Sequence, residues 1–285
     1  MKLLVLYNKN SNKKISNKKF DYLKKELGEI YDEIEIPDIS SDKKTSDYVT
    51  IPCDTILIIG GDGTIHDVIS NMLRNNINRN LCFIPTGTCN DYSRNFGYKS
   101  FKNSIKIIKE NNIVKKTVYK INDSYFNYGF ASGGISMISY DVKEKDKRKA
   151  GKLAYYFRIL KYIFKTPANS MYEIKYDDKI IKDNYYLVLA VDSKYLGGFK
   201  LRKKLRNNFS LILFKKRKRL KGCISFTSFI LFGRLPKKDK RIFTDKFYIK
   251  TDGNINVDGE LFDSKELEVS TLNNHLNIIS KIKTK

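Results

Sequence analysis

Short apolar runs alternate with apolar residues at helical spacing along the first 117 residues. The apolar runs predict buried strands at Leu3–Tyr7, Ile34–Ile36, Ile56–Gly60 and Leu81–Ile84. The helical spacing predicts helices near residues 20–30, 64–74 and 104–109, with a brief one within 40–50. Strands that alternate with helices are typical of a parallel sheet, so we expect residues 1–117 to form an α/β domain.

From residue 118 the pattern changes to short runs rich in β-branched and aromatic residues, separated by Asn, Asp and Gly. The runs predict strands at Val118–Ile121, Tyr125–Phe130, Tyr172–Tyr176, Tyr185–Val191, Phe209–Phe214, Phe247–Lys250, Ile255–Val257 and Glu268–Ser270. We therefore expect residues 118–285 to form a mostly antiparallel β-sandwich domain. Whether its last residues return to the first domain stays open. One basic amphipathic helix, Leu153–Phe164, interrupts the strands and either packs on the core or lies on a membrane.

The first of two glycine-rich turns is Gly60-Gly61-Asp62-Gly63-Thr64, directly after a predicted buried strand. Glycine lets a ligand approach the backbone, and the N-terminus of the following helix favours an anion such as phosphate. A carboxylate such as Asp62 suits phosphate when a divalent cation lies between them. The turn therefore indicates a nucleotide-phosphate site, although glycine and aspartate also occur in ordinary βα turns.

The second turn, Pro85-Thr86-Gly87-Thr88-Cys89-Asn90-Asp91, follows the next predicted strand. Open α/β sheets bind ligands at the carboxyl ends of their strands, where both turns lie. The polar loop Asn8-Lys9-Asn10-Ser11-Asn12 follows the first strand and is a further candidate for a phosphate or ribose contact.

The chain carries 55 Lys and Arg against 31 Asp and Glu, a net charge of +24. This excess favours nucleic acid or an anionic membrane as a partner, or reflects solvated surface lysines. The cluster K-K-R-K-R at 215–219 is likewise either a contact to an anionic surface or a solvated turn. No nucleic-acid motif is present. The four cysteines lack metal-ligand spacing and predict reduced thiols in a cytosolic protein. No signal peptide or membrane-length apolar run is visible, so we expect only peripheral membrane contact.

Taken together, the two glycine turns resemble those of the diacylglycerol kinase catalytic-domain family, in particular its soluble bacterial lipid kinases. Weaker marks follow in the family's order: Phe126-Asn127-Tyr128-Gly129, Gly151-Lys152-Leu153-Ala154-Tyr155, Gly197-Gly198-Phe199 and Val257-Asp258-Gly259-Glu260. The resemblance implies an α/β nucleotide domain like that of NAD kinases and then a β-sandwich domain. It also implies that ATP and lipid meet in a cleft.

The resemblance further implies roles for individual residues. The ATP phosphates would lie against Gly60, Gly61, Asp62, Gly63 and Thr64, with Asn8 and Ser11 beside the nucleotide. The pocket would be closed by Gly87, Thr88 and Asn90. Asp62 and Asp91 would reach a catalytic magnesium through water. Glu260 would take the proton of the lipid hydroxyl with Asp258 beside it, although D-G is also a hairpin-turn signal.

The sequence departs from the family pattern in three places. The first loop has Lys9 and Asn12 in place of proline and glycine, and the segment 40–50 is short and lacks G-D-A. An aspartate-rich loop that holds a structural magnesium is replaced by Arg202–Ser210, which has no carboxylate. Because Mg²⁺ prefers anionic oxygen ligands, we predict that this structural site is absent and that lysine and arginine occupy the space.

The sequence thus predicts an ATP-dependent lipid kinase that uses ATP and Mg²⁺, with diacylglycerol as the first-choice substrate and phosphatidic acid as the product. Two alternatives stay open: a non-catalytic relative that binds nucleotide and anionic lipid, and a kinase of another lipid or of NAD. We expect a cytoplasmic protein at the surface of an anionic membrane, without a nucleic-acid partner. The sequence does not decide which lipid is the substrate, nor whether the protein forms a homodimer as related proteins do.

Overall fold

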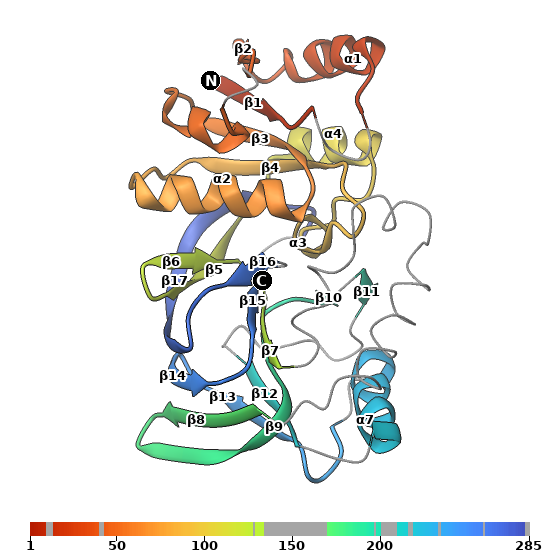
Figure 1. The fold of residues 1–285 in the computed structure, drawn as a ribbon. Coiled ribbons are helices and arrows are strands. Elements are labelled where there is room, and N and C mark those ends of the chain that lie inside the picture. Colours follow the sequence, from red (N-terminus) through yellow and green to blue (C-terminus); the bar gives the residue numbers. More distant parts are fainter. Residues whose placement is uncertain are drawn as a thin grey trace. The chain divides into compact units, whose positions relative to one another are not determined.

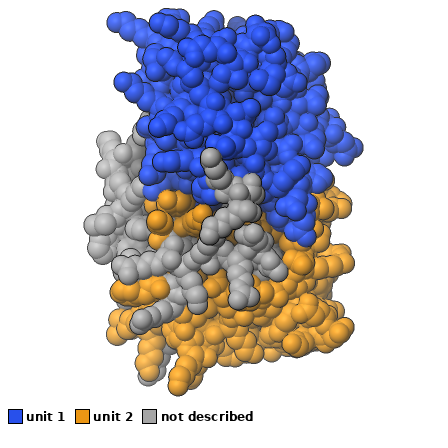
Figure 2. Space-filling model, turned by 180° about the vertical axis from the view of Figure 1, so that it is seen from behind, with its two compact units in different colours: residues 1–118, 273–285 blue, residues 119–272 orange. Residues whose placement is uncertain are grey.

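The computed structural model describes residues 1–9, 14–39, 43–127, 129–133, 170–196, 198–200, 210–215, 219–232, 235–258 and 260–282. The chain forms two compact units, residues 1–118 with 273–285 and residues 119–272, which Figure 2 colours separately. Some sequence predictions fall outside the described residues: Ser11, the helix Leu153–Phe164, the loop Arg202–Ser210 apart from Ser210, and residues 216–218 of the basic cluster.

Unit 1 is built on a parallel sheet with the strand order β2-β1-β3-β4-β17 (Figure 1). Its strands are β1 (Lys2–Tyr7), β2 (Glu33–Glu35), β3 (Thr55–Gly60), β4 (Asn80–Pro85) and the end of β17 (Glu266–Ile279). All six residues of β3 are buried. A central parallel strand is covered on both faces, which explains why it reads as an unbroken apolar run.

Helices accompany this sheet in the alternation that the sequence predicts. They are α1 (Asn17–Leu27), the 3₁₀ helix η1 (Thr45–Thr50), α2 (Asp62–Arg74), α3 (Asp91–Asn95) and α4 (Phe101–Glu110). Lys109 of α4 lies 3.0 Å from Glu26 and 2.7 Å from Glu29, so it ties α4 to the end of α1. Asn71 of α2 donates to the carbonyl of Ser46 in η1 at 2.7 Å.

The C-terminal segment completes the sheet of unit 1. Asn277 and Ile278 pair in parallel with Asn80 and Leu81 of β4. The Tyr98 hydroxyl donates to the Ile279 carbonyl at 2.8 Å, and burial raises the pKa of this phenol well above its ordinary value, so it keeps its proton. Backbone hydrogen bonds at the next two positions after β17 continue this attachment.

Unit 2 consists mainly of antiparallel strands with the order β16-β15-β7-β9-β8-β14-β17, while β12 pairs with β9 and β13, β5 with β6 and β17, and β10 with β11. The strands are β5 (Ile113–Ile121), which begins in unit 1 and ends in unit 2, and β6 (Ser124–Phe126), β7 (Gly129–Gly133), β8 (Ser170–Tyr176), β9 (Lys179–Val191), β10 (Tyr195–Leu196), β11 (Phe199–Lys200), β12 (Ser210–Lys215), β13 (Lys240–Phe243), β14 (Lys246–Thr251), β15 (Ile255–Val257) and β16 (Glu260–Phe262). Among the residues of unit 2 that the structure describes, one helix is present, α7 (Arg219–Phe232).

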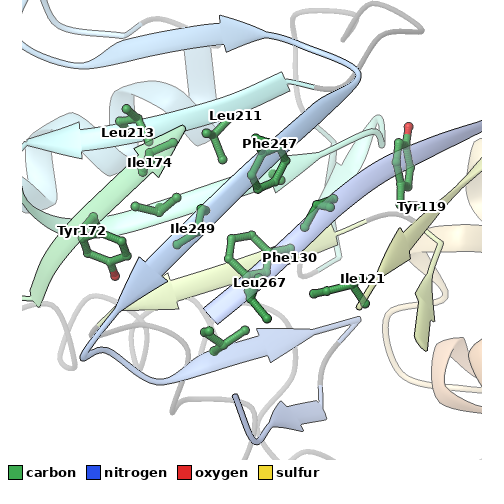
Figure 3. Close-up of a cluster of buried hydrophobic side chains, with 14 of the residues drawn as sticks. Tyr119, Ile121, Phe130, Tyr172, Ile174, Leu211, Leu213, Phe247, Ile249 and Leu267 are labelled. Carbon is green, nitrogen blue, oxygen red and sulfur yellow. The ribbon is translucent and has the colours of Figure 1, made fainter. Parts of the chain in front are cut away.

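The core of unit 2 is formed by side chains that alternate along these strands (Figure 3). In β14, for example, Phe247, Ile249 and Thr251 are buried while Lys246, Tyr248 and Lys250 are not, the period of two expected for a strand. Phe130, Tyr172 and Leu267 pack in the same cluster. Full burial of each large apolar side chain contributes about 1.5–3 kcal/mol, so this cluster is the main source of stability in unit 2.

The expected fold class, an α/β part followed by a mostly antiparallel β part, is confirmed. Three local predictions were inexact. The helix after the first glycine turn begins at Asp62 rather than near Thr64, so most of that turn lies in the first turn of α2. The run Tyr125–Phe130 is divided between β6 and β7. The strand β13 and the helix α7 were not predicted.

Candidate active site

Three chain segments meet at the carboxyl edge of the parallel sheet in unit 1. Asn8, the residue after β1, donates its backbone N–H to Ile59 of β3 at 3.0 Å. Thr86, the residue after β4, donates in the same way to Gly60 at 3.0 Å. The ends of β1, β3 and β4 are therefore fixed side by side, which brings Asn8 and the two glycine turns together as the sequence predicts.

The two glycine turns touch through their backbones. A Cβ atom on Gly61 would lie 3.1 Å from Cα of Gly87, and one on Gly87 would lie 2.6 Å from Cα of Gly61. Neither glycine has a positive φ. Among the described glycines a positive φ occurs at three other positions, all outside these turns. The glycines are needed for space rather than for an unusual backbone angle, because no side chain fits between the turns.

Polar side chains hold both turns in place. The Asn8 amide nitrogen donates to the Thr64 hydroxyl at 2.9 Å, which joins the end of β1 to the start of α2. Asn90, in the left-handed region at φ 54°, accepts from Gly87 N–H at 2.9 Å and donates to the Gly87 carbonyl at 2.8 Å. Asparagine is one of the few residues that tolerates this backbone conformation. A structural role in the turn therefore explains Asn90 as well as a ligand-binding role does.

Asp62 links the two turns through its carboxylate. One oxygen accepts from the backbone N–H of Asp91 at 3.0 Å and the other from that of Tyr92 at 2.9 Å. Asp62 thereby caps the start of α3, satisfying N–H groups that a helix leaves without intrahelical partners.

The first turn of α2 presents an open backbone at Gly63. A Cβ atom placed there would meet nothing within 4 Å, in contrast to Gly60, Gly61 and Gly87. Thr88 in the second turn is exposed, whereas Asp91 is only 2% exposed. A phosphate group would therefore have access to the N-terminal end of α2 beside Gly63, where N–H groups and the helix dipole favour an anion.

In unit 2, Asp258 is fixed by three backbone hydrogen bonds. Its carboxylate accepts from Asn127 N–H at 2.7 Å and from Gly129 N–H at 3.0 Å, and its own N–H donates to the Gly129 carbonyl at 2.8 Å. Asp258 is buried and has φ of 49°. It therefore anchors the turn between β15 and β16 to the start of β7, a structural task that the sequence did not reveal.

Glu260 is the first residue of β16 and pairs with Val257. Its side chain lies outside the described part of the chain. The nearby Asn127 is 1% exposed, and both polar atoms of its side-chain amide lack a hydrogen-bond partner among the described atoms. Buried amides are normally satisfied, so Asn127 is the unusual polar group of this region.

The sequence predicted a magnesium contact through Asp62 and Asp91, and these two residues do lie together. Within the described part of the chain, no three His, Cys, Asp or Glu side chains are grouped closely enough to hold a metal ion. The predicted loss of the structural magnesium site concerns Arg202–Ser210, which is almost wholly outside the described residues. Both statements about magnesium remain predictions.

Comparison with known proteins identifies the class of protein to which this chain is similar. Residues 2–121 match the family model of the diacylglycerol kinase catalytic domain. A diacylglycerol kinase of Staphylococcus epidermidis is 26% identical over 235 residues, covering 80% of this chain and 74% of that protein. The resemblance expected from the glycine turns is therefore confirmed: the chain is a relative of the diacylglycerol kinases, and it is a kinase.

Two solved structures share the fold. The crystal structure of a diacylglycerol kinase from Bacillus anthracis strain Sterne aligns with a TM-score of 0.74 and 18% identity, covering 98% of this chain and 97% of the other. An NAD kinase from Archaeoglobus fulgidus in complex with ATP aligns with a TM-score of 0.55 and 13% identity, covering 98% and 94%. The expected likeness to the NAD kinase fold is thus confirmed. Among the described residues, no helix is both long and apolar enough to span a bilayer.

Proposed function

We propose that this protein is an ATP-dependent lipid kinase that transfers the γ-phosphate to the hydroxyl of diacylglycerol and releases phosphatidic acid and ADP. The observation that carries the proposal is the backbone contact between the two glycine turns beside the open first turn of α2. The names of the related proteins support diacylglycerol as the first substrate to test.

The proposed reaction makes one bond and breaks one. The lipid hydroxyl oxygen attacks the γ-phosphorus, the bond from that phosphorus to the bridging oxygen of ADP breaks, and the hydroxyl proton passes to a carboxylate, for which Glu260 is our candidate. In such a reaction the protein mainly positions the reactants and stabilises developing negative charge. The start of α2 would hold the phosphates, since its N–H groups and dipole favour anions.

The residues present fit a magnesium ion that is bound chiefly by the ATP phosphates. Mg²⁺ commonly keeps several waters and touches one or two carboxylates rather than a full protein cage. Asp62 and Asp91 are the two carboxylates nearest the glycine turns, and the backbone N–H of Asp91 donates to Asp62 at 3.0 Å. When bound, the ion supplies positive charge to the phosphate oxygens.

The first test is phosphate transfer from labelled ATP to diacylglycerol in mixed micelles with an anionic phospholipid. We expect the wild type to form phosphatidic acid and Glu260→Gln to be slower by about 10²–10⁴-fold, the usual contribution of a general base. Glu268→Gln, which removes an exposed carboxylate on β17, is the matched control and should keep full activity. A wild type that binds ATP and phosphorylates no lipid would favour the non-catalytic alternative.

The second test uses the open space at Gly63. Alanine at this position creates no clash with the protein and is the better helix residue by about 0.8–1 kcal/mol, so Gly63→Ala should keep or raise thermal stability. If phosphate binds against this turn, the new methyl group should nevertheless weaken ATP binding by about tenfold or more. Calorimetric titration with ATP measures this.

Arg74→Ala is the control for Gly63→Ala, because it alters an exposed residue at the opposite end of α2. That residue is about 16 Å from Gly63 along the helix axis. Equal ATP affinity in Gly63→Ala and the wild type would exclude the first turn of α2 as the phosphate site.

A further inference from the structure

The strand pair β12–β13 in unit 2 carries side chains on two faces that differ in what covers them. Leu211, Leu213 and Ile242 point to one face and belong to the core cluster of unit 2. Residues directly opposite each other in an antiparallel pair share a face, and successive residues alternate between faces. Arg241, which lies opposite Ile212, therefore points away from the core cluster.

The face to which Arg241 points is also largely apolar. Ile212 is fully buried there, and its partner Leu189 on β9 is only 4% exposed. Two residues further along β12, Phe214 packs edge-on against Phe229 of α7 with ring centroids 5.5 Å apart. The guanidinium of Arg241 thus lies at the margin of a second apolar layer, where a positive charge is poorly solvated.

Two contacts hold this guanidinium in one orientation. Its Nε donates to the Ser210 hydroxyl oxygen at 2.6 Å, and its central carbon lies 5.2 Å from the centroid of the Phe243 ring. The Phe243 side chain is 43% exposed, so it forms the outer side of this arrangement. A guanidinium fixed along one edge and over one face is ordered before any ligand arrives, which lowers the entropic cost of binding.

The positive charge of Arg241 has no counter-ion among the described residues. Its Nη2 is buried and finds no acceptor there. Burial lowers the pKa of Arg241 below its ordinary value, and no described carboxylate opposes that shift. Asp239, two residues earlier, instead accepts from the Lys215 backbone N–H at 3.0 Å and from the Ser225 hydroxyl at 2.5 Å. Buried charges in proteins are normally paired, so this one calls for an anion.

The hydrogen-bonding groups around Arg241 suit a phosphate. Nη2 carries two N–H donors, and the Ser210 hydroxyl, which accepts from Nε, still has its own proton to donate to an anion. A phosphate monoester brings about −1.5 to −2 charges and three strong acceptor oxygens in a tetrahedral arrangement. It can therefore meet the guanidinium and the hydroxyl together, whereas a carboxylate offers two coplanar oxygens and a single charge.

We propose that Arg241 and Ser210 form an anion site in unit 2 that binds a phosphate group, with the Phe243 ring as its outer wall. Rotation of that exposed ring would open Nη2 to the ligand. The phosphate is either free or the headgroup of a phosphomonoester lipid, since both present the same oxygens. None of the residues that we assign to phosphate transfer belongs to β12 or β13, so this inference does not rest on the proposed function.

Thermal unfolding in phosphate and in chloride buffers of equal ionic strength tests the site. We expect phosphate to raise the unfolding temperature of the wild type, because a ligand that binds the folded chain stabilises it. Arg241→Met should bind phosphate about tenfold or more weakly in calorimetric titration, since charge-assisted hydrogen bonds are lost. In chloride the same variant should unfold at or above the wild-type temperature, because an apolar side chain replaces an unpaired charge.

Lys240→Met is the matched control. It removes the same charge from an exposed neighbour on β13 that lies opposite Leu213, on the other face of the sheet, and it should respond to phosphate like the wild type. Arg241→Lys keeps the charge without the planar fork and should also bind phosphate more weakly, which keeps the test decisive if the methionine variant does not fold. Equal phosphate affinity in the wild type and both Arg241 variants would overturn the proposal.

Two further ligands identify the source of the phosphate. Tighter binding of a short-chain phosphatidic acid below its micelle concentration than of inorganic phosphate would assign the site to a lipid headgroup, and equal binding would assign it to free phosphate. Acetate that binds as tightly as phosphate would overturn the choice of ligand.

The result can be separated from that of the proposed function. A phosphate response that persists in Arg241→Met but is lost in Gly63→Ala would place the ion at the start of α2, which would overturn this site and support the nucleotide site. A response that is lost in Arg241→Met would support this site even if the wild type phosphorylates no lipid.

Discussion

Two carboxylates in this protein hold turns together by accepting backbone N–H groups with both oxygens. Asp62 does so at the start of α3, and Asp258 does so at the start of β7. The resemblance to the kinase family implies catalytic roles for both. The hydrogen bonds show that each also has a structural task, so replacing either residue changes more than the chemistry of a reaction.

For Asp62→Asn we expect a loss of both stability and activity. The amide nitrogen of asparagine cannot accept a hydrogen bond, so one part-buried backbone N–H at the start of α3 loses its partner, at a cost of about 1 kcal/mol. Thermal unfolding and the kinase assay measure the two effects. Asp21→Asn, an exposed aspartate of α1, should change neither. An Asp62→Asn protein as stable as the wild type would show that these hydrogen bonds contribute little.

The residue types at the site could be predicted from the sequence, but their partners could not. The glycine turns and Asn8 lie together as predicted because each directly follows a buried strand; their roles in binding and catalysis remain predictions. The bonds of Asp62 join residues 29 and 30 positions apart, and those of Asp258 join residues 129 and 131 positions apart. Contacts of this range depend on the folded sheet, and no local pattern encodes them.

At the scale of elements, strands were predictable where burial is regular. The apolar runs of β1, β3 and β4 and the alternation in β14 identify their strands directly. The helix α7 was missed because apolar residues lie on two of its sides, which removes the one-sided periodicity that marks an ordinary surface helix.

The end of β17 should be necessary for unit 1. Ending the chain after Asn274 removes Leu276, Ile278 and Ile279, three buried side chains worth about 4.5–9 kcal/mol at about 1.5–3 kcal/mol each. Domain stabilities are about 5–15 kcal/mol, so we expect unit 1 to become protease-sensitive and ATP binding to be lost. A chain ended after Lys281 keeps these contacts and should behave like the wild type. Limited proteolysis and ATP titration would reveal whether the shorter chain still folds.

At the scale of the whole molecule, the excess of positive charge makes the remaining carboxylates important. Neighbouring lysines lower the pKa of several of them, namely Asp38, Glu173, Asp183, Glu266 and Glu268. A carboxyl group whose folded pKa is lowered stabilises the fold above its unfolded pKa of about 4. That contribution is lost as the pH falls through the lower, folded value.

We therefore expect the unfolding temperature to be nearly constant from pH 7 to about pH 5 and to fall steeply below about pH 4. Protonation then removes the ion pairs and at the same time raises the net positive charge, which increases repulsion. Because these groups are mostly exposed, 0.5 M NaCl should weaken the dependence by screening both effects. Scanning calorimetry across this range tests the expectation, and a constant unfolding temperature down to pH 3 would contradict it.

The attachment of residues 273–285 to unit 1 also matters while the chain is being made. The strand β4 is translated early in unit 1, yet it receives its last partner strand only after residues 119–272 have been translated. At roughly 5–20 residues per second, the open edge of β4 waits about 8–30 s. An unpaired strand edge is a template for aggregation, so the newborn chain should depend on chaperones more than an ordinary domain of this size.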